Sequence, residues 1–218
     1  DQAAQRGIKI IVIDSDVNSS QVSCRIGTNN LQAGIKAAEA ALATDDEELY
    51  IGIVNYDVNS ANGQQRELGF RQTVEQDPRV KNITTINVLS TTEDARAGAK
   101  EMLLSDSRIN VVVTFNEWTS LGVGWAIRDL NRADRIQVVA FDSNVVSVGM
   151  LETGEVDALI VQNPYAMGYL GVETAANLMN GQTGGPSVVD TATTIVTREN
   201  MYEPESQKIL FSFEEEGY

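Results

Sequence analysis

VVAFDSN, residues 138–144, is a run of apolar residues that ends abruptly in a carboxylate, Asp142. The same junction recurs elsewhere in the chain, where apolar runs are followed by Asp14, Asn55, Asn116 and Gln162. A single junction of this kind is explained by an ordinary turn residue or helix cap. Its repetition predicts a set of buried strands that each end in a short polar side chain.

Between these runs lie longer segments with helical periodicity, and this alternation is typical of βαβ units with a mostly parallel sheet. We therefore predict an α/β fold. Strands are expected at 8–14, 22–27, 49–55, 83–89, 109–115, 136–142, 156–162 and 193–197. Helices are expected at 31–42, 62–75, 92–104, 121–130 and 167–179, with Ile35, Ala38, Leu42, Leu68, Phe70 and Val74 on buried faces and Thr92 as a cap.

The strand ends indicate where a ligand would bind. The carboxyl ends of parallel strands open into one crevice, so Asp142, Asn116 and the other polar residues are expected to converge there. Carboxylate and amide groups are suited to hydrogen bonding hydroxyls. Arg66, in NGQQRELGF, follows the strand at 49–55 and could pair with the carboxylates. Trp118, two residues after Asn116, is a candidate ring for stacking on a ligand.

Composition excludes several classes of protein. The 218 residues include 31 acidic and 16 basic ones, and the net charge of -15 argues against a nucleic-acid partner. No apolar run approaches the roughly 20 residues needed to cross a bilayer, so we expect no membrane insertion. The single cysteine, Cys24, rules out an internal disulfide, and the absence of histidine removes the usual zinc sites and histidine-dependent triads. We expect no metal and no cofactor.

A series of motifs points to a known family. In chain order these motifs are GIKIIVIDSD, IGTNNLQAG, RELGF, NEWTSLG, VVAFDSN and LETGEVDALIVQNPYAMGYLGVETA. Their order and spacing resemble those of type I periplasmic binding proteins of the ribose and galactose class, whose fold is shared with the effector-binding core of LacI-type repressors. The resemblance implies two doubly wound parallel-sheet lobes, joined by three crossings, that close on a sugar.

The resemblance also implies roles for individual residues. Hydrogen-bonding positions of the family match Asp14 in the first lobe and Arg66, Asn116 and Asp142 in the second, and Gln162 falls at a crossing. Two further positions match less closely: Asn62 corresponds to a ligand contact of the galactose-type branch, and Thr91 stands where other members have an aromatic residue. Ser15 follows Asp14 where the ribose branch has an arginine, which argues against ribose itself.

The lobes are expected to be unequal. Residues 1–28 and 163–190 would form a first lobe that is incomplete at its N-terminus, and residues 29–162 and 191–218 would form the second lobe. The first residues include AAQRG, which resembles the last turn of a helix. The resemblance therefore implies that about two βα units, which the family carries upstream, are expected to be missing from the first lobe.

These observations favour an extracytoplasmic solute-binding protein. We expect an exported, monomeric periplasmic protein or cell-surface lipoprotein that presents a monosaccharide or similar polyol to the permease of an ABC transporter. The alternatives are the effector core of a LacI-type repressor and the sensor domain of a membrane kinase. A glycosidase with Asp14 and Asp142 as acid and base is disfavoured, because Arg66 would keep a nearby carboxylate ionised. We therefore expect no enzymatic activity.

Overall fold

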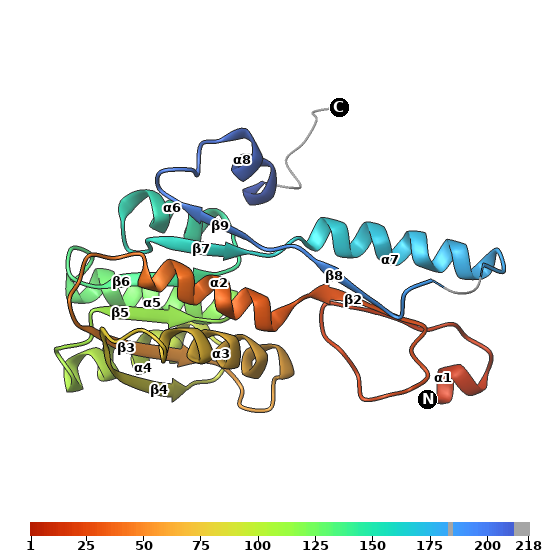
Figure 1. Cartoon of the computed structure of the whole chain (residues 1–218), viewed down its shortest axis with the longest axis horizontal. Coiled ribbons are helices and arrows are strands. Elements are labelled where there is room, and N and C mark those ends of the chain that lie inside the picture. The colour runs from red at the N-terminus through yellow and green to blue at the C-terminus, as the bar shows by residue number, and fades with distance from the viewer. Residues whose placement is uncertain (183–184, 212–218) are drawn as a thin grey trace. The chain divides into compact units, whose positions relative to one another are not determined.

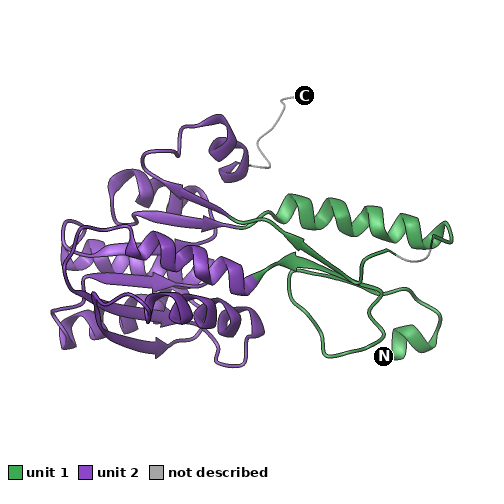
Figure 2. Cartoon of the chain, viewed as in Figure 1, with its two compact units in different colours: residues 1–29, 162–193 green, residues 30–161, 194–218 purple. Residues whose placement is uncertain are grey.

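The computed structural model of the chain describes residues 1–182 and 185–211. The chain forms two compact units (Figure 2): Asp1–Asn29 with Gln162–Thr193, and Asn30–Val161 with Thr194–Tyr218. The chain passes between the units after Asn29, Val161 and Thr193. The sequence placed these passages after residues 28, 162 and 190, which differ from the observed positions by one, one and three residues.

The second unit is built on a six-stranded sheet with the order β4-β3-β5-β6-β7-β9 (Figure 1). All neighbouring strands are parallel except β7 and β9, which are antiparallel. The strands are β3 (Leu49–Asn55), β4 (Val80–Asn87), β5 (Val111–Thr114), β6 (Gln137–Phe141), β7 (Ala158–Val161) and β9 (Thr194–Thr197). The predicted α/β class with parallel strands is thereby confirmed.

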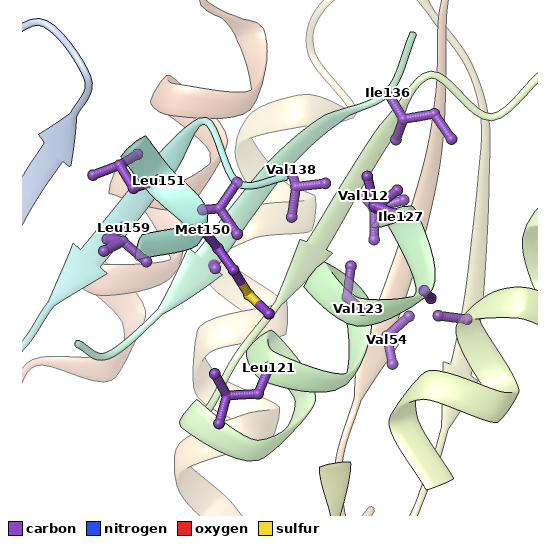
Figure 3. Close-up of a cluster of buried hydrophobic side chains, with 14 of the residues drawn as sticks. Val54, Val112, Leu121, Val123, Ile127, Ile136, Val138, Met150, Leu151 and Leu159 are labelled. Carbon is purple, nitrogen blue, oxygen red and sulfur yellow. The ribbon is translucent and has the colours of Figure 1, made fainter. Parts of the chain in front are cut away.

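Helices cover both faces of this sheet because its strands are apolar on both sides. In β5, Val111 and Val113 belong to the core beneath α2 (Asn30–Leu42) and α3 (Ala61–Val74). Val112 faces the opposite core, shown in Figure 3 with Val54 and Met150. That core is closed by α4 (Thr92–Ser105), α5 (Glu117–Leu130), α6 (Val145–Thr153) and α8 (Pro204–Leu210).

Helices α2 and α3 pack with their backbones in direct contact. A Cβ atom at Gly34 would lie 2.0 Å from the carbonyl oxygen of Arg66, and one at Gly69 would lie 2.1 Å from that of Leu31. No side chain could fit at either position without moving a helix. This contact fixes the first turns of α2 relative to the middle of α3, which carries Arg66.

The first unit has a three-stranded parallel sheet in the order β1-β2-β8. The strands are β1 (Ile11–Ile13), β2 (Cys24–Thr28) and β8 (Val188–Thr191), and the helices are α1 (Gln2–Gln5) and α7 (Pro164–Met179). Met167 of α7 packs on Cys24 and Ile26 of the sheet. The small buried core of this unit contrasts with the two cores of the second unit.

Several details differ from the sequence prediction. Thr91, and not Thr92, caps α4 through its side chain. Leu68 is 43% exposed, whereas Phe70 and Val74 are fully buried. Residues two apart in a helix do not share a face, so a stripe through Phe70 cannot include Leu68. Strand β8 and helices α6 and α8 were not predicted, because each is a short segment with little periodicity of its own.

Candidate functional site

Arg66 lies where β5 and β6 end. It is 2% exposed, and α3 carries it to the carboxyl edge of the second unit's sheet. Its Nε donates to Asn30 Oδ1 at 2.8 Å, and its Nη1 donates to the carbonyl oxygen of Phe115 at 2.7 Å. Its Cζ lies 4.8 Å from the ring centroid of Phe141. Phe115 and Phe141 directly precede Asn116 and Asp142, so the guanidinium adjoins both strand ends.

Three buried rings form the apolar base of this region. Phe70 and Phe115 have ring centroids 5.9 Å apart, and Phe115 and Phe141 have centroids 5.7 Å apart, both in edge-to-face geometry. Rings packed in this way are rigid, and the face of Phe141 attracts the cation above it. The charge of Arg66 is thus held over an apolar base, where electrostatic interactions are stronger than in water.

Asn116 uses its side chain in two directions. Its Oδ1 accepts from the backbone N–H of Thr119 at 3.0 Å and caps α5. Its Nδ2 donates to Ser90 Oγ at 2.7 Å. The capping explanation considered for the strand-end residues therefore applies to Asn116. An amide nitrogen carries two donor hydrogens, so the bond to Ser90 leaves one for a ligand.

Asp142 has a left-handed backbone conformation with φ of 68°. Its N–H donates to the carbonyl oxygen of Ile160 in the neighbouring strand β7 at 3.1 Å. Asp14 in the first unit repeats this arrangement, with φ of 63° and an N–H bond of 2.9 Å to the carbonyl oxygen of Ile26 in β2. In both units the aspartate that follows the strand thus combines an N–H hydrogen bond to the adjacent strand with a left-handed backbone conformation.

The remaining predicted residues have distinct surroundings. Asn62 accepts a 3.3 Å hydrogen bond from Asn30 and so joins the chain of contacts that includes Arg66. Thr91 is an exposed helix cap, and Trp118 is 49% exposed in the first turn of α5. In the first unit, Gln162 Oε1 accepts from Thr28 Oγ1 at 2.7 Å.

Not every polar strand end contributes to this arrangement. Asn55 is 3% exposed, and its Nδ2 donates to the carbonyl oxygen of Gly63 and to Glu67 Oε2. It therefore links β3 to α3 inside the unit. Conversely, the sequence analysis missed Asn30 and Ser90. Asn30 had a signal, since it follows the expected strand at 22–27 within IGTNNLQAG.

A cavity of about 950 Å³ lies at the opposite, amino edge of the second unit's sheet. Asn110, Gln137 and Asp157, at the starts of β5, β6 and β7, line it. Burial raises the pKa of the Asp157 carboxyl, and a hydrogen bond from the N–H of Val138 opposes this rise. The cavity includes none of the predicted ligand-binding residues.

Among the described residues, no group of three or more Asp, Glu or Cys side chains is placed so that it could bind a metal ion. Among the same residues, none of the helices combines the length and the apolar character of a membrane span.

The family model described as "Periplasmic binding protein domain" matches residues 1–183. The D-ribose/D-allose-binding protein of Pseudomonas aeruginosa is 26% identical over 208 residues, which are 90% of this chain and 64% of that protein. The ribose import binding protein RbsB of Haemophilus influenzae is 25% identical over 187 residues, or 83% of this chain and 61% of that protein. The chain thus spans less than two thirds of the length of these relatives.

Solved structures resemble this chain over most of its length. A carbohydrate transporter solute-binding protein from Agrobacterium radiobacter in complex with D-arabinose has a TM-score of 0.90 and 28% identity, covering 96% of this chain and 72% of that one. The periplasmic component of a sugar transport system from Hahella chejuensis has a TM-score of 0.85 and 30% identity, covering 90% and 72%. These comparisons give no support to the repressor alternative.

Proposed function

The chain belongs to the family of periplasmic binding protein domains, and from this premise we propose that the protein binds a monosaccharide or similar polyol and delivers it to an ABC transporter. The observation that carries the proposal is the fixed guanidinium of Arg66 beside the ends of β5 and β6. Asn116 and Asp142, which follow these strands, are short polar residues of the kind that a neutral, hydroxyl-rich ligand requires.

The chemistry of these residues fits such a ligand. Asp142 can accept hydrogen bonds from hydroxyls, Arg66 can donate, and Asn116 offers a donor from its amide. Hydrogen bonds to charged groups contribute roughly 1.5 to 3 kcal/mol each, so a few of them could sustain the about -8.2 kcal/mol of micromolar binding. Binding of this kind needs no covalent step, and the proposal therefore assigns no enzymatic activity.

Further residues of each unit are assigned to ligand binding. In the second unit we assign supporting ligand contacts to Asn62, Thr91 and Trp118, and in the first unit we assign hydrogen bonds with a ligand to Asp14 and Gln162. The named relatives support a sugar as the class of ligand, because ribose, allose and arabinose appear in their names. The permease as partner, and export to the periplasm or cell surface, follow from the same family relationship.

The test is isothermal calorimetry of the full chain with D-ribose, D-arabinose, D-allose, D-fucose and inositols. We expect at least one micromolar ligand for the wild-type protein. The Arg66→Lys variant should bind that ligand at least about tenfold more weakly, because lysine cannot reproduce the two-acceptor geometry of the guanidinium. The Arg108→Lys variant is the control, since Arg108 pairs with Asp106 on the surface. Absence of binding to every sugar and polyol of this panel would refute the proposal.

A further inference from the structure

Three consecutive residues at the first passage between the units each make a side-chain hydrogen bond. Within the first unit, Thr28 Oγ1 donates to Gln162 Oε1 at 2.7 Å, and Asn29 Nδ2 donates to Asp190 Oδ2 at 2.9 Å. Within the second unit, Asn30 Oδ1 accepts from Arg66 Nε at 2.8 Å. The first and third of these bonds involve residues of the proposed site, although Thr28 and Asn30 themselves were not assigned to it.

The amide of Asn30 is fixed at both ends. Its Oδ1 accepts a hydrogen bond from Arg66 Nε, and its Nδ2 donates one to Asn62 Oδ1 at 3.3 Å. These two partners fix the orientation of the amide group. Asn30 is also the first residue of α2, which packs backbone to backbone against α3 at Gly34. The acceptor and the arginine are therefore held at a constant separation by the helix contact.

The plane of the Arg66 guanidinium depends on this acceptor. Two oxygens on different elements, Asn30 Oδ1 and the carbonyl oxygen of Phe115, receive Nε and Nη1. A planar, forked donor group is orientated by contacts of this kind, and Asn30 supplies the one that Nε makes beside the Phe141 ring. Without Asn30, a buried N–H of a charged group would also lose its partner, which is costly.

We propose that Asn30 is a positioning residue for Arg66, and that Thr28 has the same role for Gln162. Neither residue needs to touch the ligand. Each determines the direction in which its partner's hydrogen-bonding groups point, and both belong to the segment by which the chain leaves the first unit. The inference rests on the proposed sugar-binding function of Arg66 and Gln162.

The test compares Asn30→Leu, which removes the acceptor at similar size, with Asn30→Asp, which keeps it. The first measurement needs no ligand: the Nε–H signal of Arg66 in nitrogen-15 NMR spectra, assigned by its loss in Arg66→Lys. We expect Asn30→Leu to shift this signal and speed its exchange with water, and Asn30→Asp to preserve a slowly exchanging signal. Asn110→Leu, at the amino edge, controls for a general loss of stability.

The second measurement is affinity by calorimetry with D-ribose, D-arabinose and D-allose. Asn30→Leu should weaken the best of these ligands at least about tenfold, and Asn30→Asp should remain within about threefold of wild type. Thr28→Val and Thr28→Ser form the matching pair for Gln162, with loss expected for valine and rescue by serine.

The outcomes separate the two proposals. If Asn30→Leu leaves the Arg66 signal unchanged, or weakens binding no more than Asn110→Leu does, the positioning role is refuted. If no sugar binds the wild-type chain, the proposed function fails, and the NMR comparison alone decides whether Asn30 orientates Arg66.

Discussion

The left-handed conformation of Asp142 leads to a prediction about stability. We compare Asp142→Gly with Asp142→Ala. Both substitutions remove the carboxylate and every contact it makes, so the difference between them reports the backbone alone. With φ of 68°, the alanine variant keeps a Cβ in the left-handed region, whereas glycine has none. We therefore expect the glycine variant to be the more stable one, the reverse of the order found in most of a protein.

The magnitude follows from two opposing effects. A left-handed residue with a Cβ costs roughly 1 to 2 kcal/mol, a cost that glycine does not incur. The greater conformational entropy of glycine stabilises the unfolded state of the glycine variant by about 0.4 to 1 kcal/mol relative to alanine, which reduces the advantage of glycine. At the midpoints of these ranges the net difference is about 0.8 kcal/mol in favour of glycine, or about 2 °C in melting temperature for a chain of this size.

Asp134 supplies the control for this comparison. Its side chain is 78% exposed, and its φ is not positive. There alanine should be the more stable by about 0.4 to 1 kcal/mol, because only the unfolded-state effect remains. The free energy of unfolding is measured by urea titration of all four variants. If glycine is no more stable than alanine at position 142, or if both positions show the same order, the reasoning from backbone strain is wrong. Sugar affinity should fall equally in both Asp142 variants.

Two further predictions concern packing and protonation. Gly34→Ala places a Cβ against the carbonyl oxygen of Arg66, so we expect the free energy of unfolding in urea titration to fall by about 1 to 3 kcal/mol, together with weaker sugar binding. Gly149→Ala, in α6 with open space around it, should instead raise the free energy of unfolding by about 0.5 to 1 kcal/mol. Equal effects of the two substitutions would contradict the close helix contact. Burial raises the pKa of Asp157, so the folded state favours its protonated form, and the stability that this provides is present below the ordinary pKa and lost as pH rises through the raised one. Asp157→Asn should therefore stabilise the protein increasingly as the pH rises above the ordinary aspartate pKa of about 4, and a difference that does not change with pH would refute this.

Much of the fold follows from local pattern. The alternation of apolar runs with helical periodicity predicted the main strands and helices of the second unit, because burial of an apolar face depends on the spacing of residues close in sequence. The polar residue after each run was equally visible. For Asp142 and Asn116, placement at the carboxyl edge of the sheet required only the strand end and a parallel direction.

The sequence pattern did not predict which of these residues turn inward. Asn55 and Asn116 follow similar apolar runs, yet Asn55 is buried in contact with Glu67, while Asn116 caps a helix at the sheet edge. The left-handed conformation of Asp142 was also unforeseen. Both outcomes depend on the neighbouring strand and helix, which are supplied by residues distant in the sequence.

By itself, the sequence determined the α/β class, the positions of the strand ends and the types of side chain at them. Only the tertiary structure decided that Asn30 accepts a hydrogen bond from Arg66, which lies 36 residues further along the chain. That contact depends on how closely α2 and α3 approach at Gly34 and Gly69. Periodicity states which face of a helix is buried, but the separation of two helices is set by the volumes of all the side chains between them.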